Sequence, residues 1–344
     1  MNRNIKALVI DDAALMRRAV TDILESDSQI EVVGTAGNGL EGLRKIKQLS
    51  PDVVTLDMDM PVMDGLSAIR HIMIESPVPV VVLSSLFNDG AVTFDALRLG
   101  SVDFLPKPSG AAACDLQLVG RQIVDRVKMA TSVNIGNIRR VRLERQLNQD
   151  RFACYGYRPL EYLIVFGTTI GGPNTVIRIL SQLPPQLPAA VVVLQEISPR
   201  ILPAFVDRFN DMVNWRVEAV RDGLELVQGT CYIGSNQAAV RVDSNATDEP
   251  TLRVSGPCEK PLNLLFASAA DTFREHTIGV LLSGTGDDGA QGFKCIRDAS
   301  GVTIAQDRVS CVYPNLTDNA IAHQTVDVVL DEERMLGALR SMVA

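Results

Sequence analysis

Short apolar runs alternate with amphipathic stretches in the first third of the chain. The runs are apolar at nearly every position, which predicts strands buried on both faces of a parallel sheet, and the amphipathic stretches predict the covering helices. The predicted strands are IKALVI (5–10), IEVVGT (30–35), DVVTLD (52–57) and VPVVVLS (78–84), and the predicted helices occupy 14–26, 39–49 and 65–75. This order of elements favours a doubly wound α/β domain that ends near residue 122.

A second α/β pattern begins after residue 160. The stretch 123–159 that precedes it has scattered Arg, Gln and Asn and little strand pattern, which is typical of a terminal helix and a linker. The predicted strands of the second pattern are YLIVFG (162–167), AAVVVLQE (189–196), TCYIG (230–234), TIGVLLSG (277–284) and VTIAQ (302–306). We therefore expect two α/β domains in tandem, as a length of 344 residues also suggests.

Charge and composition exclude several function classes. The 33 Lys and Arg against 41 Asp and Glu leave a net charge of −8, which argues against a protein that mainly neutralises nucleic acid or anionic lipid. The second domain carries neither a helix-turn-helix pattern nor a basic stripe, which disfavours a DNA-binding regulator. The chain lacks a long apolar run, and its six cysteines form no C-x-x-C pair. We expect a reduced, cytoplasmic protein that is not inserted in a membrane.

Polar side chains gather where the strands of the first domain are predicted to end, at the edge where open α/β sheets bind ligands. Asp11 and Asp12 follow the first strand, Asp57 ends the third, Ser84 ends the fourth, and Lys107 stands in SVDFLPKP. Crowded carboxylates repel one another unless a cation lies among them, and Mg²⁺ with its oxygen ligands suits such a site. A metal-held carboxylate can attack a phosphoryl donor, with Lys107 and Ser84 contacting the incoming oxygens.

With these motifs in this order, residues 4–122 resemble the flavodoxin-like receiver domain of response regulators. The resemblance implies that Asp57 is the phosphoacceptor. It implies that Mg²⁺ is bound by Asp12, Asp57 and the backbone carbonyl of Asp59, with Asp11 as the other member of the acid pair. It implies switch roles for Ser84, Phe104 and Lys107, and a cis peptide bond between Lys107 and Pro108. The plainer alternative is that the aspartates are only loop and N-cap residues. It is the weaker interpretation, because four motifs occur in the order that the resemblance requires: Asp11-Asp12, D-x-x-M-P-x-x-D-G from Asp57, Ser84, and Lys107-Pro108.

Residues 160–342 resemble the parallel-sheet catalytic domain of the CheB family, the chemotaxis protein-glutamate methylesterases and glutamine deamidases. GTGDDGAQG and TIAQDRVSCV carry the most specific matches. The family places a Ser-His-Asp triad in G-A-S-T-G-G, in a Gln-His pair and in G-M-G-x-D-G. Here the same frames are GTTIGG, QE and GTGDDG. The nucleophile position therefore holds Thr169, the base position holds Glu196, and Asp288 alone is retained.

These replacements predict a weak or lost hydrolase, a pseudoenzyme. An imidazole both takes and returns a proton near neutral pH, whereas a carboxylate with a pKa of about 4.3 does not do both well. The extra methyl group of threonine crowds the attacking oxygen. The chain's three histidines, His71, His276 and His323, fall outside the triad frames. The alternative left open is an active receptor methylesterase or deamidase with a rewired Thr-Glu-Asp site.

Together the two resemblances imply a phosphorylation-dependent chemotaxis response regulator. The implied partners are a chemotaxis histidine kinase, which would phosphorylate Asp57, and the methyl-accepting chemoreceptors. Phosphorylation would bias the docking of the two domains through Ser84 and Phe104.

Overall fold

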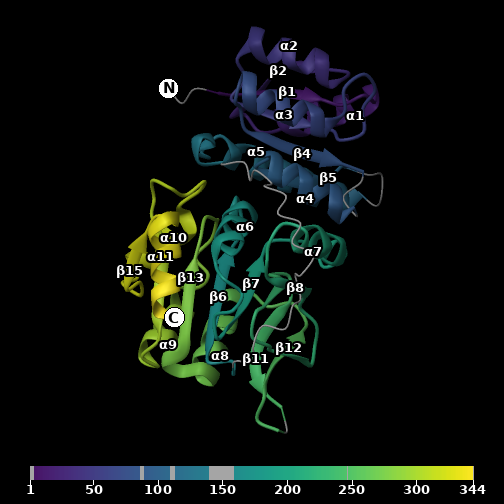
Figure 1. Ribbon diagram of the computed structural model, residues 1–344. Helices are drawn as coiled ribbons and strands as arrows, with labels where there is room; N and C mark the ends of the chain where they lie inside the picture. Colours follow the sequence, from purple (N-terminus) through teal and green to yellow (C-terminus); the bar gives the residue numbers. More distant parts are fainter. Residues whose placement is uncertain (1–3, 86–88, 109–112, 139–158, 246, 344) are drawn as a thin grey trace. The chain divides into compact units, whose positions relative to one another are not determined.

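The computed structural model describes residues 4–85, 89–108, 113–138, 159–245 and 247–343 (Figure 1). The chain divides into two compact units, Met1–Arg140 and Val141–Ala344, which we call the first and the second unit. Each unit contains a parallel sheet with helices between its strands, so the predicted pair of α/β domains is confirmed.

The first unit has a five-stranded parallel sheet in the order β2-β1-β3-β4-β5, the flavodoxin-like order of doubly wound folds. Its strands are β1 (Ile5–Ile10), β2 (Ile30–Ala36), β3 (Val53–Leu56), β4 (Val80–Ser84) and β5 (Asp103–Pro106). Its helices are α1 (Ala14–Glu25), α2 (Gly39–Leu49), α3 (Gly65–Glu75), α4 (Gly90–Leu99) and α5 (Ala113–Ala130), followed by the 3-10 turn η1 (Ile135–Asn137).

Both faces of this sheet are buried, as the apolar runs predicted. Leu8 and Ile10 of β1 belong to the cluster formed with α2, α3 and α4. The alternate residues Ala7 and Val9 are equally buried on the opposite face, since neighbouring strand residues point to opposite sides. Helices α1 and α5 contact each other.

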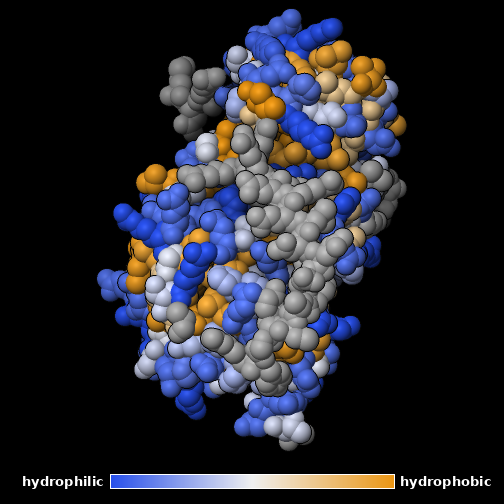
Figure 2. All heavy atoms as spheres, in the orientation of Figure 1, coloured by the Kyte–Doolittle hydropathy of each residue, from blue (hydrophilic) through white to orange (hydrophobic). Residues whose placement is uncertain are grey.

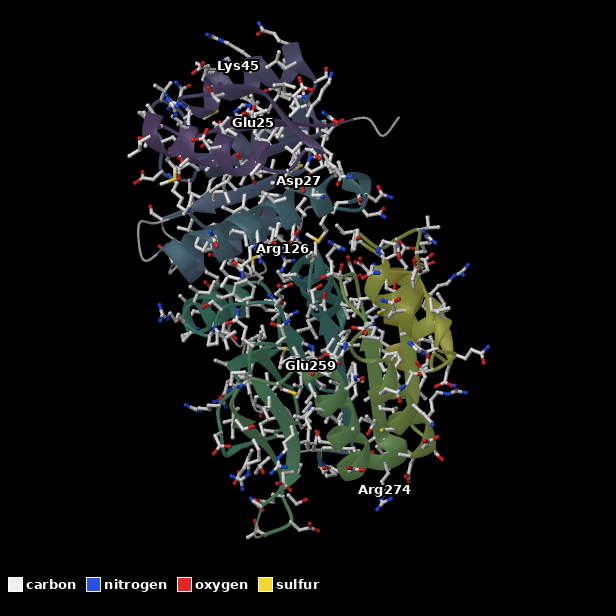
Figure 3. The ribbon with its side chains drawn as sticks, turned by 180° about the vertical axis from the view of Figure 1, so that it is seen from behind. Glu25, Asp27, Lys45, Arg126, Glu259 and Arg274 are labelled. Carbon is white, nitrogen blue, oxygen red and sulfur yellow. The ribbon has the colours of Figure 1, made fainter. Side chains whose placement is uncertain are left out.

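Helix α5 runs past residue 122, the predicted end of the first domain. Its second half is held by ion pairs with the rest of the first unit, Lys128 with Asp27 at 2.9 Å and Arg126 with Asp103 at 3.4 Å (Figure 3). Within the described residues no peptide bond is cis, so the prediction of a cis bond between Lys107 and Pro108 is wrong. A trans bond is the lower-energy isomer even before proline.

The second unit has a seven-stranded parallel sheet in the order β15-β14-β13-β6-β7-β10-β8 and a separate antiparallel sheet, β11-β12-β9. The strands of the large sheet are β6 (Tyr162–Thr168), β7 (Ala189–Gln195), β8 (Arg216–Ala219), β10 (Thr230–Ser235), β13 (Thr277–Leu281), β14 (Val302–Gln306) and β15 (Val328–Leu330). The small sheet consists of β9 (Leu224–Glu225), β11 (Ala239–Ser244) and β12 (Pro250–Ser255).

The helices of the second unit are α6 (Gly172–Gln182), α7 (Leu202–Asn210), α8 (Pro261–Phe273), α9 (Ala290–Asp298), α10 (Asn315–Ala322) and α11 (Glu332–Met342), with the 3-10 turn η2 (Arg274–His276) before β13. Helices α8 and α9 pack against Leu163 and Val165 of β6 and Leu281 of β13. Helix α11 is joined to α6 by an ion pair between Glu332 and Arg178 at 2.6 Å.

Apolar side chains on the visible face of the molecule appear in separate patches between polar ones (Figure 2). Scattered exposed apolar residues are normal for a globular protein. None of the described helices is both long enough and apolar enough to cross a bilayer.

Candidate functional site

The first unit brings its predicted acidic residues together at one edge of the sheet. Asp11 directly follows β1 and Asp57 directly follows the neighbouring β3. One carboxylate oxygen from each of Asp11, Asp12 and Asp57 lies within 4.8 Å of the others. The ammonium of Lys107, which follows β5, lies 2.7 Å from Asp11 Oδ2 and 2.8 Å from Asp57 Oδ2. The structure thus places all four side chains in one pocket.

The backbone after β3 holds Asp57 in this pocket. Asp57 Oδ1 accepts a hydrogen bond from the N–H of Met58 at 2.8 Å, which leaves Oδ2 toward Lys107. At the end of the loop, a Cβ on Gly65 would lie 2.5 Å from the Asp57 carbonyl oxygen. Gly65 ends the run DMDMPVMDG that begins at Asp57, and close packing against that aspartate requires a glycine at this position.

Burial sets the electrostatics of the pocket. Asp57 is 2% exposed and Asp11 is 3% exposed. Burial raises the pKa of Asp57, the charge of Asp11 raises it further, and Lys107 only partly opposes this. For Lys107, burial lowers the pKa, but the two carboxylates together outweigh it and leave the pKa above its ordinary value. One ammonium thus pairs with two buried carboxylates, and Asp12 beside them is exposed.

The donor set fits Mg²⁺, which binds carboxylate and carbonyl oxygens. Asp12 and Asp57 would supply carboxylate oxygens, and Asp59 lies exposed in the loop after β3, where its carbonyl was expected to act. A divalent cation would also relieve the repulsion that contributes to the raised pKa of Asp57.

Two of the three expected switch residues, Ser84 and Phe104, are buried. Ser84 is the last residue of β4, and its carbonyl accepts a hydrogen bond from the Lys107 N–H at 3.2 Å. Phe104, on the neighbouring β5, packs into the cluster beneath α3 and α4. Ser84 and Lys107 are therefore linked directly through the backbone.

The second unit places its three triad-frame positions at the carboxyl ends of neighbouring strands. Thr168 and Gln195 are register partners on β6 and β7, so Thr169 and the half-buried Glu196 follow two adjacent strand ends. Asp288 lies in the loop between β13 and α9, and β13 is the other neighbour of β6. The fold thus keeps the frame of the site.

The turn that carries Thr169 is packed too tightly for larger residues. Gly171 has a φ of +74°, a conformation that favours glycine. A Cβ on Gly172 would lie 1.7 Å from Thr168 Oγ1. The Thr168 hydroxyl in turn donates to the Ser283 carbonyl at 2.7 Å.

The hydroxyl of Thr169 is engaged by the loop after β13. Its Oγ1 accepts a hydrogen bond from the Thr285 N–H at 2.7 Å and lies 3.4 Å from the Thr285 hydroxyl oxygen. The Thr169 N–H also donates to the Ser283 carbonyl at 3.3 Å. These bonds fix the hydroxyl oxygen as an acceptor within the loop structure.

The retained aspartate holds the start of a helix. Asp288 Oδ2 accepts the Leu262 N–H at 2.7 Å, and Oδ1 accepts the N–H groups of Asn263 at 3.0 Å and Gly289 at 2.8 Å. Helix α8 needs this partner because its N-cap residue, Lys260, makes no side-chain cap. Burial raises the pKa of Asp288 and outweighs these three N–H groups, which lower it. Both carboxylate oxygens are thus committed to the backbone.

None of the three histidines stands at a triad-frame position. His71 is on α3 and contacts Glu75 at 2.8 Å. His276 precedes β13, at the opposite edge of the sheet, where its ring stacks edge-on against Tyr162. His323 is exposed at the end of α10, where it is close enough to Asp287 of the GTGDDG frame to contribute to lowering the pKa of that carboxylate, although Lys260 is the main cause.

Comparison with known proteins matches each unit to one family. The family model of the CheB methylesterase matches residues 164–339, and that of the response regulator receiver domain matches residues 7–116. A protein-glutamate methylesterase/protein-glutamine glutaminase of Caldanaerobacter subterraneus is 36% identical over 344 residues, covering 96% of this chain and 94% of the relative. One from Geobacillus kaustophilus is 35% identical and covers 99% of both chains.

The crystal structure of the Thermotoga maritima CheB methylesterase catalytic domain supports the fold of the second unit. It is superposed with a TM-score of 0.50 at 24% identity, covering 53% of this chain and 98% of that domain. With the family models and the relatives that match along nearly the whole length, this chain belongs to the CheB family, in which a receiver domain precedes a CheB methylesterase domain.

Proposed function

We propose that this chain is a phosphorylation-dependent chemotaxis response regulator whose methylesterase domain binds chemoreceptors with little or no hydrolysis. The observation that carries the proposal is the contrast between the two sites. The receiver pocket gathers Asp11, Asp12 and Asp57 around Lys107, a set that suits phosphoryl transfer to Asp57, whereas the triad frames of the second domain hold Thr169 and Glu196. A cytoplasmic location and the domain ranges 4–122 and 160–342 are part of this proposal.

In the receiver domain, Asp57 Oδ2 forms the new bond to phosphorus. The donor's leaving group departs from phosphorus with the electron pair of the broken bond. A chemotaxis histidine kinase is the proposed donor. Lys107, 2.8 Å from Oδ2, orients the carboxylate, and its positive charge stabilises the oxygens of the incoming group.

Asp12, Asp57 and the Asp59 carbonyl would hold Mg²⁺, with Asp11 beside them. When bound, the ion supplies charge neutralisation for the phosphoryl oxygens. The switch hydroxyl is that of Ser84, and Phe104 is the switch aromatic. The backbone bond between the Lys107 N–H and the Ser84 carbonyl supports this proposal, because it ties the two residues that would contact the phosphoryl group.

In the second domain, the proton transfers of ester hydrolysis lack a suitable base. The Thr169 oxygen accepts the Thr285 N–H, and both oxygens of Asp288 accept backbone N–H groups. Glu196 stands where the family places an imidazole, the group that both accepts and donates a proton near neutral pH. These contacts support a domain that keeps the family's shape at the strand ends and has lost its chemistry.

Two assays test the two halves of the proposal. The purified chain should take up phosphate from acetyl phosphate only with Mg²⁺, and Asp57→Asn should abolish uptake while the exposed α1 variant Asp22→Asn does not. Uptake that survives Asp57→Asn would refute the phosphoacceptor assignment. Methylated receptor membranes should release no methanol with the chain. Release that disappears in Thr169→Ala would instead establish the rewired Thr-Glu-Asp hydrolase.

A further inference from the structure

The side chain of Arg17 reaches back to the turn that carries the acid pair. Arg17 lies in the first half of α1, and its Nη1 donates to two backbone carbonyls, that of Asp11 at 2.6 Å and that of Asp12 at 2.9 Å. The guanidinium is half-buried. A single nitrogen thus ties together two of the three residues between β1 and α1.

The two aspartates of this turn are held differently. The Asp11 N–H donates to the Ala36 carbonyl at 3.0 Å. The N-cap residue of α1 is Ala13, which has no side-chain acceptor for the helix. The Asp11 side chain is fixed, because Oδ1 accepts the Ala13 N–H at 2.9 Å and Oδ2 faces Lys107. Asp12 is exposed, and its carboxylate makes no hydrogen bond to the described residues. The position of the Asp12 carboxylate therefore depends on the backbone that Arg17 clamps.

Arg17 itself lies beside an anchored carboxylate of α2. Glu41 accepts the Gly37 N–H at 2.8 Å and pairs with Lys45 at 2.8 Å, and Lys45 is also hydrogen-bonded to the Thr35 carbonyl. The Gly37 N–H and Lys45 lower the pKa of Glu41, and Arg17 is close enough to lower it further. The charge of Glu41 therefore favours the guanidinium in its clamping position.

We infer that Arg17 is a positioning residue for the metal site, holding the Asp12 carboxylate in place through the turn backbone. The inference rests on the proposed function, in which Asp12 and Asp57 bind Mg²⁺. Arg17 donates to carbonyl oxygens and leaves the carboxylate oxygens of the pocket to the ion. It is thus the counterpart of the outer partners that orient ligands in known metal sites.

Charge and position predict opposite effects for removing Arg17. Coulomb's law alone predicts tighter Mg²⁺ binding, because a nearby positive charge disappears. Loss of the clamp predicts weaker binding, because Asp12 must then be ordered when the ion binds. Weaker binding therefore identifies the positional role and cannot arise from the lost charge.

The test is calorimetric titration of the full chain with MgCl2. Arg17→Met keeps the aliphatic stem and removes the donors. Its matched control is Arg18→Met, because Arg18 is the neighbouring arginine, 84% exposed, with its nearest carboxylate, Asp22, 4.0 Å away. We expect Arg17→Met to bind Mg²⁺ about 10-fold more weakly than the control, with Arg17→Lys recovering part of the loss. The Mg²⁺-induced rise in the receiver's melting temperature should fall in the same order.

Each outcome separates the two claims. Wild-type chain that binds no Mg²⁺ would overturn the proposed receiver function. Wild-type binding with equal affinities for Arg17→Met and Arg18→Met, or tighter binding by Arg17→Met, would overturn the inference alone. Should Arg17→Met fail to fold, the Arg17→Lys and Arg18→Lys pair carries the comparison, and equal Mg²⁺ affinities there would again contradict the clamp.

Discussion

Asp288→Ala removes the carboxylate that holds the start of α8 and is the sharpest perturbation of the second domain. The carboxylate accepts three backbone N–H groups, from Leu262, Asn263 and Gly289. Gly289 keeps a second acceptor, the side-chain oxygen of Asn263 at 3.0 Å. The N–H groups of Leu262 and Asn263 therefore lose this acceptor at the first turn of the helix.

The expected cost follows from these two groups. Loss of a helix N-cap costs about 0.5–2 kcal/mol, and a buried donor left without a partner costs about 1–3 kcal/mol. Asp288 is only partly buried, so water replaces some of what is lost. We expect Asp288→Ala to lower the free energy of unfolding by about 2–4 kcal/mol. Asp288→Asn keeps one acceptor oxygen and should lose about half as much.

Urea unfolding followed by tryptophan fluorescence measures this cost in the right domain. Trp215 is the chain's one tryptophan and is fully buried in the second unit, so its signal reports on that unit. The matched control is Asp287→Ala, which removes the adjacent carboxylate, 70% exposed and paired with Lys260 at the surface. Exposed ion pairs contribute little, so the control should leave the midpoint nearly unchanged. If Asp288→Ala is no more destabilised than Asp287→Ala, the helix-anchoring role is wrong.

Val62 has a φ of +69°, a strained conformation for a β-branched residue, and is 79% exposed. Val62→Asn should therefore stabilise the receiver by about 1 kcal/mol in chemical unfolding, and an unchanged midpoint would contradict this backbone strain. The Thr55 hydroxyl is buried without a hydrogen-bond partner among the described residues. Thr55→Val should therefore raise the free energy of unfolding by about 1 kcal/mol in the same assay, and a lowered free energy would contradict this reasoning. Thr169→Val removes the acceptor of the Thr285 N–H. It should lower the free energy of unfolding of the second unit by about 1 kcal/mol in urea and leave methanol release unchanged. An unaltered stability would count against the hydrogen bond between Thr169 and Thr285. The pKa of Asp57 is raised above 3.8 in the folded state, so the folded chain binds this proton more tightly than the unfolded chain does. The stability of the receiver without Mg²⁺ should therefore fall as pH rises from 3.8 through the folded pKa. Asp57→Asn should flatten that fall, and pH curves that stay parallel for the two proteins would refute the raised pKa of Asp57.

The receiver pocket could be predicted from the sequence because its geometry follows from topology. Asp11, Asp57 and Lys107 each follow a strand, and parallel strands end at the same edge of a sheet, so order along the chain nearly determines proximity. The burial of the strands on both faces could also be predicted, because their apolar runs do not alternate with polar residues.

The features that could not be predicted from the sequence depend on contacts between segments that lie far apart in the chain, or on strands too short to show a pattern. No local pattern indicates that Asp288 anchors α8, whose own N-cap position holds Lys260, or that Thr169 accepts the N–H of Thr285. The clamp by Arg17 uses backbone carbonyls, which every residue possesses, so the sequence carries no signal for it. Short strands with exposed positions, such as β8, β9 and β15, also lack a readable period.

Methanol release from methylated chemoreceptor membranes tests the central claim most directly. The full chain, treated with acetyl phosphate and Mg²⁺, is incubated with the membranes, and release is compared with that of membranes alone. We predict that phosphorylation through Asp57 leaves release at the background level, because the second domain lacks a functional triad. Release that rises with acetyl phosphate, and that disappears in both Asp57→Asn and Thr169→Ala, would contradict this account.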